Sequence, residues 1–370
     1  MAKENGRYVF MIYDLIVIGG GASGLTAAVT ASRRNKSVLI LERDQKVGAK
    51  ILVTGNGKCN LSATDVCADK YNRPDFVREI LEEEDVLSFI HSVGIMTKTA
   101  DKRIYPYSES ALTVVTKLRA ALPERTVETH DVKEISKKGD VFFVDGYQAK
   151  NVALCTGSAA TKGKAGYHLF LPFGHTVTPL RPALVPLLCD TEYIKGLSGL
   201  RAKVRLTLLR GKAPCAREEG EILFRDGGVS GIAAMMLSSF IARNPGEYGL
   251  SVDFIPDNKE RAALFLTGGK ADGVLHKAIA QAVERYAEKK GVSVLDALSD
   301  FRLRDVRCGP LSQAQVTCGG LDVEGFDHDL MSKFVTGLYA GGEVLDVDGE
   351  CGGYNLHWAF ASGIRIGKSV

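Results

Sequence analysis

The stretch DLIVIGGGASGLTAAVTASRR, residues 14–34, decides the fold of this chain. Residues 14–19 are rich in β-branched side chains, which is typical of a strand buried in a parallel sheet. A glycine-rich turn follows, and residues 22–34 then read as a helix. This order predicts the start of a βαβ unit.

Three glycines in the turn fit the spacing GxGxxG. Gly19 permits the tight turn, Gly21 lets the backbone approach a pyrophosphate, and Gly24 lets the helix pack on the strand. Ala22 and Ser23 open the helix, whose N-terminus offers free N–H groups and a positive dipole end to phosphates. The turn therefore predicts a dinucleotide site.

A second strand, residues 37–41, ends in Glu42, 18 residues after Gly24. A carboxylate at this point accepts hydrogen bonds from an adenosine ribose and repels a 2′-phosphate, which argues against NADP in this position. Asn35 ends the helix, since asparagine tolerates the left-handed conformation. A lone GxGxxG is also compatible with a merely structural turn, and the motif alone leaves NAD and FAD open.

Composition sets the outer bounds. A chain of 370 residues holds about two or three domains. Its 45% apolar and 25% charged content argues against long disorder and against a coiled coil. The 47 basic and 44 acidic side chains give a net charge of +3, which is too balanced to indicate a nucleic-acid or membrane partner.

The cysteines and histidines lack the spacing of metal sites. None of the eight cysteines forms a CxxC, and the seven histidines include no HxxxH pair, so we predict no metal and reduced thiols. No apolar run reaches the roughly 18 residues of a membrane span. We therefore expect a cytoplasmic protein without a membrane partner.

Long composite motifs lie beyond the first unit. They are RDQKVGAKILVTGNGKCNLS at 43–62, RIYPYS at 103–108, VALCTGS at 152–158, TPLRPALVPL at 178–187 and GLYAGGEVLDVDGECGGYNLHWAFASG at 337–363. This set resembles a bacterial family of FAD flavoproteins, the aminoacetone-oxidase-like or NAD(P)/FAD-dependent oxidoreductases. The resemblance covers nearly the whole chain and implies FAD as the cofactor.

Pattern and resemblance imply the same α/β architecture. It is a discontinuous, Rossmann-like FAD domain of the glutathione-reductase type with an inserted β domain and a small helical module. We expect the FAD-binding domain at residues 1–165 and 316–370, the β-rich domain at 166–254 and the helical module at 255–315. Helical spacing further predicts helices over 74–93 and 275–290, with the acidic run 82–85 as a solvated face.

The motif and the resemblance together assign the cofactor contacts. Gly342 and Glu343 aim a carboxylate at the ribityl hydroxyls, the backbone of Val132 matches the family's adenine contact, and the last helix directs its dipole at the flavin. The full set is Gly19, Gly21, Ala22, Ser23, Gly24, Glu42, Arg43, Lys50, Asn56, Gly57, Lys58, Cys59, Asn60, Val132, Thr156, Gly157, Gly342, Glu343, Gly353, Tyr354, Asn355 and Leu356.

Candidates for catalysis are few. Cys59 lies in the loop expected near the flavin and would need a lowered pKa to act; otherwise it is a small packing residue. Arg103 and Tyr107 belong to RIYPYS, which resembles a family stretch beside the active site; otherwise this is a turn stiffened by Pro106. His357 fits a hydrogen-bonded helix residue better than a catalytic base.

The resemblance implies an FAD-dependent oxidoreductase that reduces an activated C=C or related bond of a small molecule. The sequence contains no second strand–GxGxxG–helix unit, so NAD(P)H is expected to dock only transiently as electron donor. Relatives are described as acting on aminoacetone-like amines, bile-acid ketosteroids and ribosomal-RNA uridine. A flavin-dependent RNA uridine reductase is thus an alternative, and it predicts a basic face that includes Lys195, Arg201, Lys203, Arg205, Arg210 and Lys212. A non-enzymatic flavin redox sensor is another.

Overall fold

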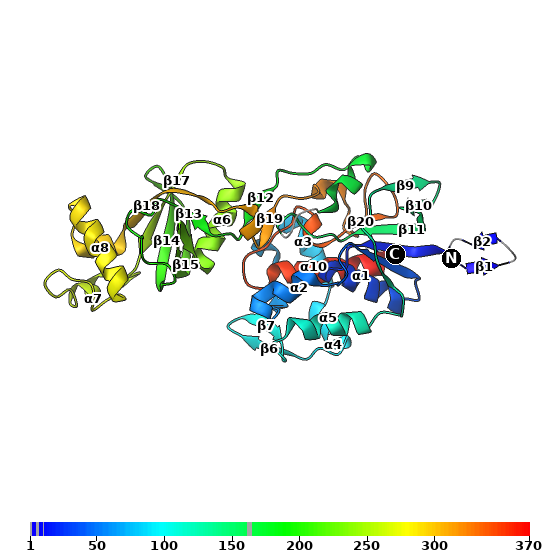
Figure 1. Ribbon diagram of the computed structural model, residues 1–370, viewed down its shortest axis with the longest axis horizontal. Helices are drawn as coiled ribbons and strands as arrows, with labels where there is room; N and C mark the ends of the chain where they lie inside the picture. Colours follow the sequence, from blue (N-terminus) through cyan, green and yellow to red (C-terminus); the bar gives the residue numbers. More distant parts are fainter. Residues whose placement is uncertain (1, 5–6, 10, 161–164) are drawn as a thin grey trace. The chain divides into compact units, whose positions relative to one another are not determined.

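The strand predicted ahead of the glycine-rich turn is β3 (Ile12–Ile18), and it lies inside a seven-stranded sheet (Figure 1). The computed structural model describes residues 2–4, 7–9, 11–160 and 165–370. The chain divides into two compact units, the first comprising residues 1–180 and 319–370 and the second residues 181–318.

The sheet of the first unit has the order β8-β4-β3-β11-β10-β9, and β20 also pairs with β11. Neighbours from β8 to β11, and the pair β11 and β20, run parallel, whereas β9, β10 and β11 form an antiparallel meander. The strands are β4 (Val38–Glu42), β8 (Val127–Thr129), β9 (Ile135–Lys138), β10 (Val141–Val144), β11 (Tyr147–Leu154) and β20 (Leu338–Ala340).

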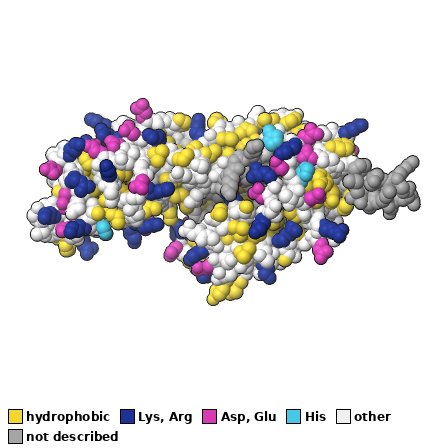
Figure 2. All heavy atoms as spheres, in the orientation of Figure 1, with side chains coloured by type: hydrophobic (Ala, Val, Ile, Leu, Met, Phe, Trp, Pro, Cys, Tyr) yellow, Lys and Arg dark blue, Asp and Glu magenta, His cyan; other side chains and the backbone are white. Residues whose placement is uncertain are grey.

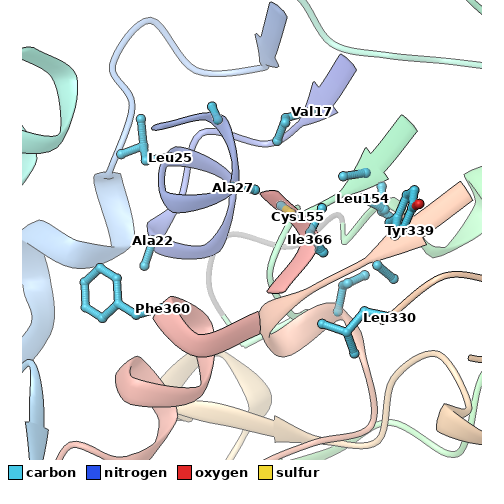
Figure 3. Packing of buried hydrophobic residues seen from close by; sticks show 14 of the residues in the cluster. Val17, Ala22, Leu25, Ala27, Leu154, Cys155, Leu330, Tyr339, Phe360 and Ile366 are labelled. Atoms are coloured by element: carbon cyan, nitrogen blue, oxygen red, sulfur yellow. The ribbon is translucent and has the colours of Figure 1, made fainter. Parts of the chain in front are cut away.

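Two long helices pack on each other beside this sheet. They are α1 (Ala22–Arg33) and α10 (Tyr354–Ser369). A side chain at Gly363 would overlap the Ser23 backbone, and one at Gly367 would approach Thr30 Cβ to 2.5 Å, so glycine is what permits this close contact. Figure 3 shows the resulting core, in which side chains of α1 and α10 lie with those of β3 and β11.

Predicted and observed helices differ at residues 74–93. The spacing predicted one helix, and this prediction is wrong: the structure has α3 (Pro74–Glu83) and α4 (Val86–Ser92). Asp85 causes the break because its Oδ1 accepts the Ser88 N–H at 2.9 Å, which caps a new helix.

The acidic run 82–85 is also not simply a solvated face. Glu84 is buried, and its carboxylate pairs with Arg365 Nε at 2.9 Å and with Lys368 Nζ at 2.7 Å. These basic groups belong to the last turns of α10, and a helix period cannot reveal such a distant partner.

Shorter elements complete the first unit. They are β1 (Ala2–Glu4), β2 (Arg7–Val9), α2 (Ala49–Val53), η1 (Thr54–Gly57), β5 (Ser62–Ala63), η2 (Ala68–Lys70), β6 (Thr97–Ala100), β7 (Arg103–Pro106), α5 (Ala111–Ala120), η3 (Gly166–Leu169), η4 (Leu171–Phe173), η6 (Val323–Gly325) and η7 (Gly342–Val344). Strands β5, β7 and β6 form a small antiparallel sheet.

The second unit is a closed barrel with helices. Its strands follow the order β13-β16-β15-β14-β17-β18. They are β13 (Leu187–Leu188), β14 (Arg201–Arg210), β15 (Ala213–Arg225), β16 (Gly228–Ser230), β17 (Tyr248–Asp253) and β18 (Phe301–Cys308). The other elements are β12 (Arg181–Ala183), which pairs with β19 (Val316–Cys318), and α6 (Ile232–Arg243), α7 (Lys259–Ala263), α8 (Lys277–Lys290), α9 (Val294–Ser299) and η5 (Leu311–Gln313).

One core joins the barrel to its helices. Leu206 and Leu250 of the barrel belong to the same apolar cluster as Val283 of α8 and Ala297 of α9. The helix α8 ends where the sequence predicts, at Gly291, whose φ is +65°. Among the described residues, no helix has both the length and the apolar character needed to cross a membrane.

Candidate active site

The glycine-rich turn has the geometry that GxGxxG requires. Gly19 has φ +103°, and a Cβ there would lie 2.5 Å from the Cys155 carbonyl oxygen. A Cβ at Gly24 would overlap the carbonyl oxygen of Gly19. Gly21 differs, because its φ is −79° and a Cβ would meet nothing closer than the Cys155 oxygen at 4.0 Å. The space over Gly21 is therefore open, and its backbone can be approached closely.

The start of α1 is open as well. No side chain of the described residues caps this helix, whose N-cap is Gly21. Ala22, Ser23 and Gly24 form its first turn, where backbone N–H groups have no intrahelical acceptor. An open glycine beside an uncapped helix start fits a pyrophosphate.

Glu42 is fixed at the end of β4. Its Oε2 accepts the Gly20 N–H at 2.6 Å, and its Oε1 accepts the Asp44 N–H at 2.9 Å. The neighbouring strand β8 reaches the same edge, since the His130 N–H donates to the Glu42 carbonyl at 2.8 Å. The carboxylate, half-buried, thus lies next to the glycine turn.

Two further predicted residues follow these strand ends. Val132 comes just after β8 and is buried, whereas Arg43 comes just after Glu42 and is exposed, with Nε 3.8 Å from Asp44 Oδ1. Both lie near the edge where Glu42 is held.

Lys50 and Glu343 come together although they are 293 positions apart. The Lys50 ammonium pairs with Glu343 Oε2, and the Ser158 hydroxyl donates to Glu343 Oε1 at 3.0 Å. Burial, and then the Glu343 carboxylate, raise the pKa of Tyr167. Sequence reasoning missed Ser158 and Tyr167, because no local motif marks either residue.

The loop over residues 54–60 follows an unusual backbone path. Gly55, Asn56, Gly57 and Cys59 all have positive φ, between +54° and +84°. A Cβ added at Gly57 would have no heavy atom within 4 Å, so this glycine leaves open space beside the loop. Lys58 forms an ion pair with Glu109, with its Nζ 2.8 Å from Glu109 Oε2.

The end of this loop and the residues after it pack against the start of α10. A Cβ at Gly353, the N-cap of α10, would lie 2.5 Å from the Ser62 carbonyl oxygen and 3.0 Å from Asn60 Oδ1. That amide oxygen is buried without a hydrogen-bond partner among the described residues. A buried orphan acceptor beside an uncapped helix start fits a bound polar group.

Asn355, near the start of α10, holds the preceding loop in place through hydrogen bonds. Asn355 Oδ1 accepts the Gly349 N–H at 2.8 Å, and its amide donates back to the Gly349 carbonyl at 2.9 Å. Tyr354 donates to Asp65 Oδ1 at 2.7 Å, and Leu356 is half-buried. The Asn355 side chain is thus occupied within the protein.

The strand ends β11 and β20 supply the remaining predicted residues. Thr156 Oγ1 accepts the Gly166 N–H at 3.0 Å, and Gly157 has φ +69° with no heavy atom within 4 Å of a Cβ. Gly342 donates its N–H to Ser362 Oγ at 2.9 Å. Because β20 pairs with β11 in parallel, the segments that follow the two strands leave the same edge of the sheet.

The catalytic candidates differ in their surroundings. Cys59 is fully buried, and burial raises its pKa to about 11, the opposite of what an acid or nucleophile needs. The structure therefore favours a packing role for this thiol. Arg103 lies on β7 opposite Ala63. Burial raises the pKa of the Cys351 thiol, and the nearby positive charge of Arg103 partly opposes this rise. Tyr107 is 59% exposed.

His357 lies one turn into α10 and is buried. Its Nδ1 is 2.8 Å from Ser62 Oγ, while its Nε2 has no hydrogen-bond partner among the described residues. Burial lowers its pKa to about 4, so the imidazole is neutral at physiological pH. Within the described ranges, no group of three or more histidine, cysteine or acidic residues is placed to hold a metal.

The Rossmann-type sheet and its glycine cradle are those of the FAD-dependent oxidoreductases. The chain belongs to the HI0933-like protein Rossmann domain family, a family of that class, whose model matches residues 13–369.

Two relatives match along nearly their whole length. The "3-dehydro-bile acid delta(4,6)-reductase" of Clostridium scindens is 32% identical over 96% of this chain and 98% of its own. The "Ribosomal RNA dihydrouridine synthase" of Haemophilus influenzae is 28% identical over the same shares of the two chains. Among solved structures, 3-ketosteroid delta1-dehydrogenase from Sterolibacterium denitrificans matches with TM-score 0.51 and 13% identity, covering 97% of this chain and 99% of its own, which indicates a shared fold.

Proposed function

We propose that this protein reduces an activated C=C bond of a small molecule, using FAD and electrons from NAD(P)H. The observation that carries the proposal is the cradle formed by Gly21, the uncapped start of α1 and the fixed Glu42 carboxylate. The full-length similarity to a named bile-acid reductase supports this reaction class.

The residues that would hold FAD follow from this geometry. The first turn of α1 binds the pyrophosphate, Glu42 accepts hydrogen bonds from the ribose, and the backbone of Val132 contacts adenine. The Lys50–Glu343 pair takes the ribityl chain, since it offers a fixed carboxylate with a neutralising cation.

At the flavin end, the protein supplies orientation and charge. FAD when bound supplies hydride chemistry between a reduced nicotinamide and the substrate. The open start of α10 carries a positive dipole end, which stabilises negative charge that develops near Gly353. The Asn60 amide oxygen, buried and unpartnered among the described residues, accepts a hydrogen bond from a bound group.

A small molecule is favoured over RNA by the charges of the second unit. Arg201 pairs with Glu221, and Arg205 binds Glu219 at 2.5 Å and Asp257 at 2.6 Å. Basic and acidic side chains are interspersed over the face drawn in Figure 2. Because RNA affinity depends on unneutralised cations, these pairs make Arg201 and Arg205 poor RNA contacts, whereas Lys203 and Arg210 of the same strand form no ion pair with any described residue.

We further propose that the nicotinamide donor docks transiently, since the sequence carries a single strand–GxGxxG–helix unit. We also propose a cytoplasmic location, because none of the eight cysteines, all of which lie in the described part of the chain, forms a disulfide, as expected in a reducing compartment.

The substrate class is tested by comparing two acceptors. FAD-loaded protein is reduced without oxygen and mixed either with a steroid 4-en-3-one or with unmodified ribosomal RNA. We expect the enone absorbance to disappear as the flavin reoxidises, while the RNA gains no dihydrouridine. Dihydrouridine formation would favour the RNA enzyme instead, and a reduced flavin that neither acceptor reoxidises would favour the redox-sensor alternative.

A further inference from the structure

A cavity of about 540 Å³ lies in the second unit, far along the chain from the glycine turn. It is bordered by strands β14, β17 and β18 and by helices α8 and α9, all of which belong to residues 181–318. Its volume is within the range of about 300–1,000 Å³ that is usual for small-molecule sites. Nothing in the proposed reaction uses this cavity.

The cavity has an aromatic and aliphatic floor. Tyr193, Tyr286, Leu209 and Leu303 line it and are all buried. The two tyrosine rings meet edge to face, with centroids 4.9 Å apart. A floor of this kind favours a flat apolar body over a sugar or an inorganic ion.

The charged residues at the rim are mostly neutralised. Ion pairs with distances of 2.8 Å hold Arg302 with Asp300, Arg304 with Asp190 and Asp296 with Lys259. Lys289, whose Nζ lies 5.8 Å from the centre of the Tyr193 ring, pairs with Glu192, whereas Lys290 forms no ion pair with any described residue. Its Nζ lies 5.8 Å from the centre of the Tyr193 ring. In this part of the described chain, a cation without a carboxylate partner thus lies beside the aromatic floor.

The floor also contains an unsatisfied polar group. Tyr193 is only 7% exposed, and its hydroxyl has no hydrogen-bond partner among the described residues. The oxygen itself has almost no accessible surface, so it lies behind the floor and not on the cavity wall.

From these contacts we propose that the cavity binds a small aromatic monoanion. The ring of the ligand packs on Tyr193 and Tyr286, and its carboxylate pairs with Lys290. The site uses residues of the second unit alone and is independent of the reaction proposed for the first.

The test uses the full-length, flavin-loaded protein and two matched probes. Binding of 2-naphthoate, which carries the anion, and of neutral 2-naphthamide is measured by saturation-transfer NMR. We expect saturable binding of both, with Lys290→Met weakening 2-naphthoate about five- to tenfold while changing 2-naphthamide less than about twofold. Lys277→Met, at the other end of α8, is the charge-matched control and should change neither.

A second variant locates the site. Val292 lies at the rim and is 45% exposed, so Val292→Trp fills the entrance without disturbing the core, and it should abolish binding of both probes. An unchanged far-ultraviolet circular dichroism spectrum and an unchanged thermal transition verify that each variant, including its second unit, is folded. Absence of saturable 2-naphthoate binding, or equal affinities in the wild type and in Lys290→Met, would overturn the proposal.

Discussion

A glycine in the dinucleotide turn can be needed for the fold itself or for the space that the pyrophosphate occupies, and Gly21 is needed only for that space. Its φ of −79° suits any residue, and a Cβ would have 4.0 Å of clearance, so Gly21→Ala should fold normally. The added methyl group fills the space proposed for the pyrophosphate. We therefore expect unchanged thermal unfolding of the FAD-free protein and a loss of FAD affinity of about tenfold or more, measured by fluorescence titration.

Gly24 provides the contrast. A Cβ there overlaps the carbonyl oxygen of Gly19, so Gly24→Ala should destabilise the FAD-free protein itself. If Gly21→Ala bound FAD as tightly as the wild type, the assignment of the pyrophosphate to this turn would be wrong.

Two buried histidines predict how stability depends on pH. Burial lowers the pKa of His175 and of His357 from 6.5 to about 4. Between these pH values the unfolded chain takes up protons that the folded protein does not, so the free energy of unfolding decreases as the pH falls from about 6.5 to about 4. Each histidine contributes at most about 3 kcal/mol to that decrease.

Urea unfolding at several pH values measures this slope. His175→Gln and His357→Gln should each flatten it, whatever their effect on absolute stability. His168→Gln, a change at an exposed position, is the control and should leave the slope as it is. A slope unaffected by both buried substitutions would show that other groups cause the acid sensitivity.

At the scale of the elements, the break between α3 and α4 depends on one capping side chain. Asp85 accepts the Ser88 N–H, so Asp85→Ala should lower the free energy of unfolding by about 1 kcal/mol, while Asp85→Asn should lower it less. Chemical denaturation measures both. Glu82→Ala, an exposed position in the same acidic run, is the matched control, and an equal loss there would argue against the cap.

The elements also explain what the sequence could predict. The end of α8 agrees with prediction, because a glycine stop is a local signal. The break after Glu83 was missed because helical spacing continues across it, although the Asp85 cap that causes it is a local contact. The burial of Glu84 was missed because the position of its partner Arg365 is defined only in the folded chain.

The same distinction holds for the candidate site. The conformations of Gly19 and Gly24 follow from a motif six residues long, and the structure agrees with them. Ser158 and Tyr167 approach Glu343 only through the pairing of β11 with β20, so no short pattern marks them. The sequence left open whether the pKa of Cys59 is lowered. The structure shows that this thiol is buried, and burial raises its pKa.

At the scale of the whole molecule, the charge pattern predicts weak RNA binding. Glu219 and Glu221 neutralise Arg205 and Arg201 across β14 and β15. Glu219→Gln with Glu221→Gln frees Arg201 and removes one of the carboxylates that bind Arg205, while Asp257 still pairs with Arg205; the change should raise affinity for a ribosomal-RNA fragment at low salt by about three- to tenfold. Fluorescence anisotropy at low and high salt measures the change.

A control variant has the same net charge as the variant that carries Glu219→Gln and Glu221→Gln. Glu124→Gln with Glu134→Gln removes two exposed acids of the first unit, for which no ion pair is found among the described residues. This variant should gain little RNA affinity. Tight, salt-sensitive RNA binding by the wild type would contradict the preference for a small substrate.

The central claim is that this chain is an FAD-dependent oxidoreductase, and one experiment addresses it most directly. The purified protein is mixed with FAD, freed of unbound cofactor, and titrated without oxygen with NADH and then with NADPH while its absorption spectrum is recorded. We predict the bands of a bound flavin, bleached rapidly by at least one of the two nucleotides. A protein that stays colourless after exposure to FAD would contradict the account at its foundation.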